Sequence, residues 1–394
     1  MKKSLDHLFT LIDEAEIIQV TRDLVAIPSI MEREGRGVLD YLSRWFGDLR
    51  IPVRIYPAEG DRGNFFADFG ETRGAGRYMI NGHQDTKPVD GMTIEPFGGV
   101  IREGRLYGRG ACDMKGAVAA VLCAFKVLRR AGITPMGGIT FYSDIEEEAG
   151  AFGGFHWAIR EGLLDGYEGV ISCEPTELEV HLGNRGGFVT AFRTSGISVH
   201  SGRAELGVNA IHDMAFFIAE YIKLPYLKAE NPYFGRCTVN FEKIEGGLFR
   251  SAVPDSCRAC VDSRLIPETP PEVVQREVHE LMADLKRTRG ILVEEVEEPE
   301  GWRAHSAKYK AESIPEDHEL TRRVVEAVKQ ATGRDPRLGG CPGGTIAGAS
   351  IARGVPGIIC GPGSIAQAHT KDEWVATDQL RDAARIYTAL MAGM

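Results

Sequence analysis

Short β-rich segments alternate with helical segments over most of this 394-residue chain. Apolar residues recur at helical spacing over 14–27 and 36–49, and a longer helical segment, 114–132, ends in two arginines and a glycine. The β-rich segments lie at 51–57, 64–70, 77–81, 137–143, 169–173 and 354–360. Because this alternation is typical of helices covering a parallel sheet, we expect an α/β domain with a largely parallel sheet.

The middle of the chain follows a different pattern. Its strand-like segments are 187–195, 236–245, 255–265 and 291–298, and its helical segments are 206–223 and 271–288. The resulting β-α-β-β-α-β order is that of the ferredoxin-like split motif. The acidic segment 294–301 looks like an exit linker. We therefore expect an inserted ferredoxin-like domain at 184–298, between two parts of the α/β domain at 1–183 and 299–394.

Composition and charge argue against several classes of partner. A net charge of −10 disfavours nucleic acid or an anionic membrane as a partner, because either would select a basic surface. The N-terminal residues do not resemble a signal peptide, and no apolar run of about 18 residues is present. We therefore expect a cytoplasmic protein with neither kind of partner. Cys257 and Cys260 form one C-x-x-C, a weak indication of a zinc or redox pair.

Histidine or carboxylate residues follow four of the β-rich segments. They are His83 and Asp85 after 77–81, Glu147 and Glu148 after 137–143, Glu174 after 169–173 and His369 after 354–360. Asp113 stands at the start of the helical segment 114–132. Because ligands of open α/β sheets bind beyond the carboxyl ends of the strands, we expect these side chains to converge. Such a mixed nitrogen and oxygen set suits zinc, cobalt or manganese.

Taken singly, each of these residues has an ordinary structural explanation. Asp113 could cap a helix, His83 could be a packed turn histidine, and Asp85 could form an Asx turn. A run of glutamates is usually a solvated face. Four strand ends that each supply a candidate ligand favour a metal site over these separate explanations.

The segment 143–150, SDIEEEAG, places three consecutive carboxylates directly after a β-rich segment. Neighbouring like charges repel unless solvent or a cation offsets them, and a bound metal would do so. If the segment is extended, alternate side chains share a face. Glu146 therefore remains an alternative to Glu148 as a ligand.

Five motifs in order resemble one known family. GHQDTKP, LYGRGACDMKG, EEAG, CEPT and AHTKDEW are similar to motifs of the zinc-dependent superfamily of aminoacylases, acetylornithine deacetylases, succinyl-diaminopimelate desuccinylases and glutamate carboxypeptidases. The resemblance runs from about residue 15 to 390. It implies an α/β catalytic domain with an inserted ferredoxin-like lid or dimerisation domain, and a homodimer formed through that domain.

The resemblance also implies roles for the motif residues. His83 and Glu174 would hold one metal ion, Glu148 and His369 a second, and Asp113 would bridge the two. Glu147 would be the general base and Asp85 would orient His83. The ions would be zinc, with cobalt or manganese as alternatives.

Further residues match the family outside the metal motifs. His200 would reach the partner subunit's active site and support the oxyanion, or else be a turn histidine. Arg264 would contact a substrate carboxylate or form a structural ion pair, and Arg250 is a second candidate for that carboxylate. Gly361 and Gly363 would form a loop against the substrate.

Three positions depart from the family pattern. Ser251 stands where asparagine is frequent, Ile346 where an acidic residue is frequent, and Lys87 where an apolar residue is common. These departures leave the metal motifs intact but prevent the transfer of a particular substrate.

The sequence therefore predicts a di-metal hydrolase that cleaves the amide of an N-acyl amino acid or a related small amide carrying a carboxylate. An exopeptidase or dipeptidase of the same fold is the alternative, since both cleave an amide beside a carboxylate. A catalytically silent metal-binding homologue is a third hypothesis, which the presence of the base and all five ligand candidates disfavours.

Overall fold

The computed structural model describes residues 4–31, 33–70, 76–150, 153–297 and 307–393. The chain divides into two compact units. The first comprises 1–183, 313–341 and 345–394, and the second comprises 184–312 and 342–344. The end of the predicted linker 294–301 lies outside the described residues. Within the described ranges, no helix is both long and apolar enough to cross a membrane.

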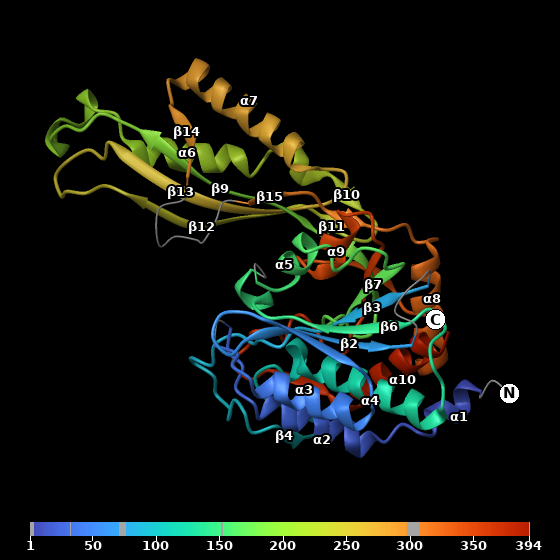
Figure 1. Cartoon of the computed structure of the whole chain (residues 1–394). Helices are drawn as coiled ribbons and strands as arrows, with labels where there is room; N and C mark the ends of the chain where they lie inside the picture. Colours follow the sequence, from blue (N-terminus) through green and yellow to red (C-terminus); the bar gives the residue numbers. More distant parts are fainter. Residues whose placement is uncertain (1–3, 32, 71–75, 151–152, 298–306, 394) are drawn as a thin grey trace. The chain divides into compact units, whose positions relative to one another are not determined.

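A nine-stranded mixed sheet forms the centre of the first unit (Figure 1). Its strands, in spatial order, are β1 (Val53–Pro57), β2 (Gly63–Phe69), β6 (Ile139–Ser143), β3 (Tyr78–Asn81), β7 (Gly169–Ser172), β18 (Gly357–Ile359), β8 (Val180–Asn184) and β16 (Glu312–Ser313), with β17 (Leu338–Cys341) also paired to β8. The four strands β6, β3, β7 and β18 run parallel to their neighbours within this group. The pairs β1–β2, β2–β6 and β18–β8 are antiparallel.

The sheet is thus mixed, whereas the sequence led us to expect a largely parallel one. Residues 58–62 alone join β1 to β2, and a connection this short allows only an antiparallel pair. The four strands whose ends carry the predicted ligands form a parallel part of the sheet.

Helices cover both faces of this sheet (Figure 1). They are α1 (Leu5–Phe9), α2 (Glu14–Val25), α3 (Gly37–Asp48), α4 (Gly116–Ala131), α5 (Phe155–Arg160), α8 (Glu319–Thr332), α9 (Ile346–Ile351) and α10 (Thr377–Gly393). Phe65 and Phe141 face a core shared with α2, α3, α4, α8 and α10. Their strand neighbours Phe66 and Tyr142 face a smaller core shared with α5 and α9. This alternation follows from the two-residue period of a strand.

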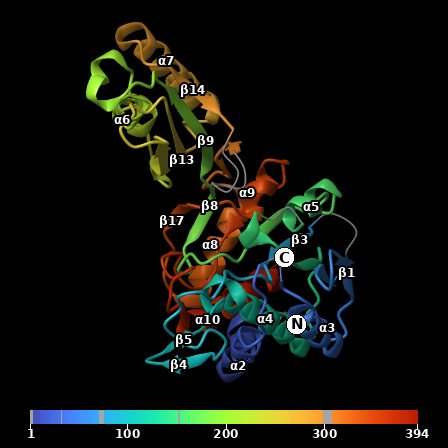
Figure 2. The ribbon, with the colours of Figure 1, turned by 90° about the vertical axis from the view of Figure 1, so that its left-hand side faces the viewer.

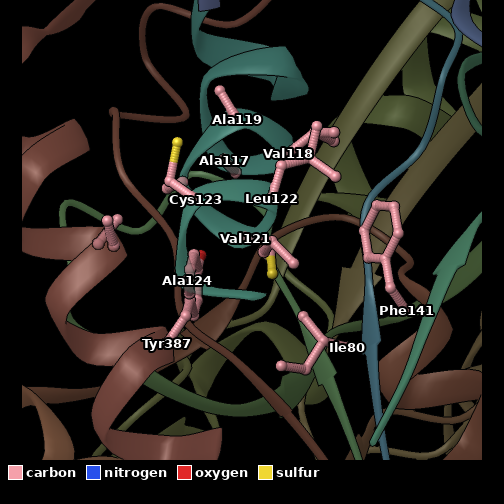
Figure 3. Packing of buried hydrophobic residues seen from close by; sticks show 14 of the residues in the cluster. Ile80, Ala117, Val118, Ala119, Val121, Leu122, Cys123, Ala124, Phe141 and Tyr387 are labelled. Atoms are coloured by element: carbon pink, nitrogen blue, oxygen red, sulfur yellow. The ribbon is translucent and has the colours of Figure 1, made fainter. Parts of the chain in front are cut away.

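The buried helix α4 is the centre of the larger core. Figure 3 shows Val118, Val121 and Leu122 of α4 near Ile80 and Phe141 of the sheet. The helix ends at Ala131, and the φ of +69° at the next residue, Gly132, is the left-handed conformation that closes helices. The predicted stop at the two arginines and the glycine is therefore confirmed. A small separate sheet has the order β19 (Trp374–Ala376), β5 (Arg105–Tyr107) and β4 (Val100–Arg102).

The second unit is built on an antiparallel sheet (Figure 2). Its strand order is β12 (Thr238–Gly246), β13 (Ser256–Leu265), β9 (Gly186–Ser195) and β14 (Val293–Val296), with β15 (Ala307–Tyr309) also paired to β9. Two helices, α6 (Ala210–Tyr221) and α7 (Pro271–Arg289), share one apolar core with this sheet. The four predicted strands and two predicted helices of this region are confirmed in order and type. Two short strands, β10 (Glu230–Asn231) and β11 (Gly235–Arg236), form a separate hairpin.

Candidate metal centre

The candidate ligands follow four adjacent parallel strands of the first unit. The spatial order β6, β3, β7, β18 brings their carboxyl ends to one edge of the sheet. Beyond this edge lie Glu147 and Glu148 after β6, His83 after β3, Glu174 after β7 and His369 after β18. Because parallel neighbours end side by side, the predicted convergence of these strand ends is confirmed.

One set of contacts centres on His83. Its Nε2 lies 3.0 Å from Oδ1 of Asp113 and 3.9 Å from Oε1 of Glu174. All three residues are buried. The imidazole nitrogen of His83 therefore has carboxylate oxygens of Asp113 and Glu174 beside it.

A second set centres on His369. Its Nε2 lies 3.0 Å from Oε2 of Glu148 and 3.4 Å from Oδ2 of Asp113. Asp113 thus directs one oxygen toward His83 and the other toward His369. A carboxylate placed in this way can bridge two cations.

The donor chemistry and the charge of the site fit divalent cations. In two groups of three residues, the ligand atoms of each group all lie within 4.8 Å of one another. These groups are His83–Asp113–Glu148 and His83–Glu147–Glu174. Burial, together with neighbouring carboxylates, raises the pKa of Glu147 and of Glu174 well above the ordinary value. Crowded anions of this kind are stabilised by a cation, and imidazole with carboxylate oxygen suits zinc, cobalt or manganese.

Burial and hydrogen bonding have opposing effects on the pKa values of Asp113 and His369. Burial alone would raise the pKa of Asp113, but hydrogen bonds from His369 and His83 lower it below its usual range. The same contacts raise the pKa of His369 to about 9, with the bond to Asp113 the largest cause. Asp113 is therefore held as a carboxylate, the form that ligates metal.

The three consecutive glutamates have three different surroundings. Glu146 has a φ of +59°, so the segment turns instead of remaining extended. Its carboxylate pairs with Arg62 at 2.6 Å and accepts the backbone N–H of Gly153 at 2.8 Å. The premise that Glu146 and Glu148 share a face is therefore wrong, and Glu146 belongs to an ion pair outside both ligand groups.

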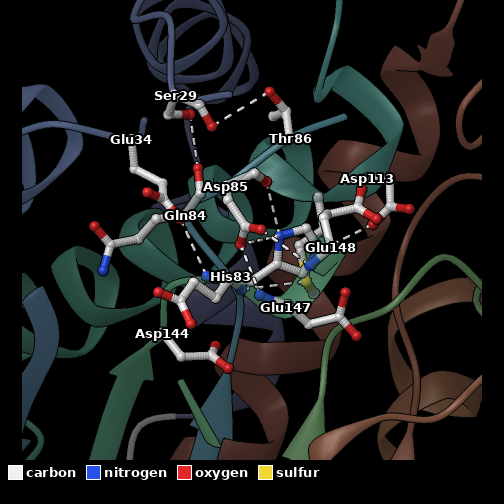
Figure 4. Close-up of polar contacts among 12 residues, drawn as sticks. Ser29, Glu34, His83, Gln84, Asp85, Thr86, Asp113, Asp144, Glu147 and Glu148 are labelled. Carbon is white, nitrogen blue, oxygen red and sulfur yellow. Dashed lines mark hydrogen bonds and ion pairs between the residues drawn. The ribbon is translucent and has the colours of Figure 1, made fainter. Parts of the chain in front are cut away.

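The side chain of Asp85 supports this turn, and the backbone carbonyl of Asp85 contacts His83 (Figure 4). Its carboxylate accepts the N–H groups of Glu147 at 3.1 Å and Glu148 at 2.9 Å. The Nδ1 of His83 lies 2.9 Å from the carbonyl oxygen of Asp85 and 3.6 Å from its carboxylate. Burial raises the pKa of Asp85 to about 7. We had expected the carboxylate to orient His83, whereas the closer contact is made by the carbonyl.

Glu373 supports the site, and it was not singled out from the sequence. Its buried carboxylate pairs with Arg109 at 2.8 Å and accepts the backbone N–H groups of Gly110, Cys112 and Asp113 at 2.9–3.1 Å. These contacts fix the main chain that carries Asp113. Glu373 stands inside the motif AHTKDEW, and an acidic residue at this place in a matched motif could have marked it as part of the site.

Lys87 contacts the centre directly. Its Nζ lies 3.1 Å from Oε2 of Glu148 and donates to the backbone carbonyl of Glu148 at 2.6 Å. The sequence marked Lys87 only as a departure from the family pattern.

The two candidate glycines lie beside the centre. A Cβ on Gly361 would stand 2.1 Å from the carbonyl oxygen of Cys173, so only glycine allows this loop to approach the main chain next to Glu174. Gly363 has a φ of +87° and donates its N–H to Gln379 at 2.7 Å. Both positions therefore need glycine for structural reasons.

Three other candidates belong to the second unit. His200 is exposed, and its Nδ1 accepts the N–H of Gly202 at 3.0 Å. Arg264 pairs with Asp262 at 2.8 Å and donates to the hydroxyl of Tyr309 at 3.1 Å, so the ion-pair alternative for Arg264 is realised. Arg250 is exposed in a turn.

Comparison with known proteins gives concordant matches. The sequence profile described as Peptidase family M20/M25/M40 matches residues 79–393, which include every candidate metal ligand. An acetylornithine deacetylase from Proteus mirabilis is 28% identical in an alignment of 376 positions that covers 91% of each protein.

Solved structures share the fold. Aminopeptidase PepT from Bacillus cereus superposes with a TM-score of 0.80 at 22% identity and covers 97% of this chain and 99% of its own. An M20 family metallo-carboxypeptidase from Sulfolobus solfataricus gives a TM-score of 0.72 at 20% identity, covering 96% and 98% of the two chains.

Proposed function

This chain belongs to peptidase family M20/M25/M40 and is a metal-dependent amide hydrolase, and we propose that it removes the acyl group from an N-acyl amino acid or a related small amide. One observation carries this proposal. Asp113 lies between His83 and His369, and the carboxylate of Glu147 lies within 4.8 Å of the ligand atoms of His83 and Glu174. That arrangement supplies both metal ligands and a general base.

We assign five residues to two divalent ions, with zinc as the preferred metal and cobalt or manganese as alternatives. His83 and Glu174 would hold the first ion, Glu148 and His369 the second, and Asp113 both. Ions held there would supply Lewis-acid activation of a water and of the substrate carbonyl.

Glu147 is the proposed general base. Burial and the neighbouring carboxylates raise its pKa, which makes this carboxyl group a better proton acceptor. It would take the proton of the attacking water and deliver it to the leaving amine. Asp85 holds the backbone of Glu147 in place and so positions this carboxylate.

The acyl group and the leaving amine define two candidate activities. The acetylornithine deacetylase from Proteus mirabilis supports N-acyl amino acids as substrates. The fold shared with an aminopeptidase supports an exopeptidase or dipeptidase as the second candidate. Arg264 and Arg250 are proposed to bind a substrate carboxylate, a role that Arg264 would combine with its pair to Asp262. Gly361 and Gly363 would line the substrate side of the centre.

We propose that the second unit is a ferredoxin-like domain through which two copies of the chain form a dimer. Its strand order β14-β9-β13-β12, with α6 and α7 on a shared core, supports the ferredoxin-like assignment. The edge strand β12 carries the exposed side chain of Ile244, and Leu248 and Phe249 just beyond it are 87% and 78% exposed. A second copy would cover these apolar side chains and the open strand edge.

His200 is proposed to stabilise the oxyanion in the partner's active site. Because its Nδ1 accepts a hydrogen bond from Gly202, its Nε2 carries the proton of the neutral imidazole. That N–H is free to donate to a developing negative charge.

A cytoplasmic location remains part of the proposal. All eight cysteines are buried. Buried cysteines in this number suit a reducing compartment.

The test is amine release from N-acetyl, N-succinyl and N-formyl amino acids and from a set of dipeptides. Each substrate would be assayed with zinc-loaded, cobalt-loaded and chelator-treated enzyme, and with Glu147→Gln as the matched control. Chelator-sensitive release from one acyl series, with a loss of about 10²–10⁴ in Glu147→Gln, would support the deacylase. Release mainly from dipeptides would support the second candidate. Full activity in Glu147→Gln would reject the assignment of the base.

A further inference from the structure

Lys87 places a positive charge on one side of the candidate metal centre. Its ammonium group lies 3.1 Å from Oε2 of Glu148. The same oxygen lies 3.0 Å from Nε2 of His369. One ligand oxygen of the Glu148–His369 position is therefore shared between a lysine and a histidine.

Lys87 is also held in this place. Its Nζ donates to the backbone carbonyl of Glu148 at 2.6 Å, so two oxygens of one residue bind the ammonium. The side chain is 29% exposed, and that of Glu148 is 5% exposed. Water therefore screens the pair only in part, and the charge of Lys87 acts on the centre at short range.

The other metal position has no such neighbour. The Glu174 carboxylate lies 3.9 Å from His83 Nε2, and no lysine or arginine among the described residues lies within 4.0 Å of Glu174. Among the described residues, a lysine thus contacts Glu148 of one position, whereas no lysine or arginine contacts Glu174 of the other.

We propose that Lys87 makes the two metal positions unequal, so that the Glu148–His369 position binds its ion more weakly than the His83–Glu174 position. This inference rests on the di-metal centre proposed above. A divalent ion at the weaker position would share the Glu148 carboxylate with the ammonium and would remain near its positive charge. An ion at the His83–Glu174 position is not opposed by this ammonium, so this position fills first.

The test is calorimetric titration of zinc into the metal-free full-length chain, with bound metal counted by elemental analysis. The variants are Lys87→Met, which removes the charge, and Lys87→Arg, which keeps it. Lys223→Met is the matched control, because Lys223 forms an ion pair with Glu220 in the second unit.

For the wild-type chain we expect two zinc ions with separate dissociation constants. Lys87→Met should tighten the weaker one at least tenfold and leave the tighter one within about threefold. Lys87→Arg and Lys223→Met should match the wild type. A weaker constant that is unchanged or poorer in Lys87→Met would overturn the inference while the two-ion centre stands. A wild-type chain that binds no zinc would overturn the proposed centre and the inference with it.

Discussion

Asp85 accepts the backbone N–H of Glu147 through its carboxylate, at 3.1 Å. Its other carboxylate oxygen binds the next N–H, that of Glu148, at 2.9 Å. The proposed base and one proposed ligand therefore stand on a turn that a single buried side chain holds.

Replacing Asp85 tests whether that turn positions the centre. In Asp85→Asn only one side-chain oxygen remains to accept the two N–H groups, so the turn loosens. We expect zinc affinity to fall about 10–100-fold, the usual effect of losing a group that orients ligands. Zinc titration measures this, and Asp90→Asn, at an exposed position, is the control. An Asp85→Asn chain with unchanged zinc affinity would limit Asp85 to a local structural role.

Glu373→Gln should destabilise the first unit. The substitution leaves the buried Arg109 guanidinium without its counter-charge, a loss that typically costs about 3–5 kcal/mol in free energy of unfolding. Urea unfolding of the metal-free chain measures the cost. Glu319→Gln removes an exposed ion pair with Arg323 and should cost far less than the loss of the buried pair. Equal losses in the two variants would contradict the assigned importance of Glu373.

His200→Ala should fold and dimerise normally but lose about 10²–10³ in kcat, the effect of removing one oxyanion donor. Mixing it with Glu147→Gln tests whether His200 acts across subunits. Half of the randomly mixed dimers would pair one subunit of each kind. Each such dimer would contain one intact site, so activity should recover to about one quarter of the wild-type value. No recovery in dimers shown to have exchanged subunits would place His200 in its own subunit's site or outside catalysis.

His181 predicts a pH dependence of stability. It lies in β8, its Nδ1 is buried without a hydrogen-bond partner among the described residues, and burial lowers its pKa to about 4. As the pH falls from about 6.5 to 4, the unfolded chain binds the proton before the folded chain does. The free energy of unfolding should therefore decrease over this window, by up to about 3 kcal/mol from His181 alone.

Urea unfolding across this pH range, with a chelator present throughout, measures that contribution. His181→Gln cannot take up the proton, so its stability should change less with pH than that of the wild type. His212→Gln, at an exposed position, is the control. Parallel pH profiles for His181→Gln and the wild type would disprove the contribution.

The sequence predicted the parts of the fold that depend on periodicity. The helix 114–132 corresponds to α4 and its closing Gly132, and the strand ends that carry His83 and Glu174 lie on adjacent parallel strands. Hydrophobic spacing determines which segments become strands. The short connection after β1 makes the β1–β2 pair antiparallel, so the sheet is mixed. The prediction of a largely parallel sheet followed the overall alternation of strands and helices and did not use this local constraint.

The contacts that support the site could not be predicted in the same way. Glu373 acts by accepting backbone N–H groups near Asp113, which stands far from it in sequence. Any residue can offer an N–H, so the residue types give no sign of such a contact. The conformation of Glu146 was missed for a related reason, because the residue types do not reveal its positive φ or the contacts of its carboxylate with Arg62 and Gly153.

Strand β18 lies between β7 and β8, although it comes from the last part of the chain. A growing chain must therefore carry β7 with one unpaired edge until residues 357–359 have left the ribosome. At about 5–20 residues per second, that interval lasts roughly ten seconds or more, during which the edge can pair with the wrong strand. His369 emerges later still. A chain that stalls before this residue is exposed to aggregation and lacks one proposed ligand. Folding of the first half would therefore not complete the proposed metal centre, which also requires the last part of the chain.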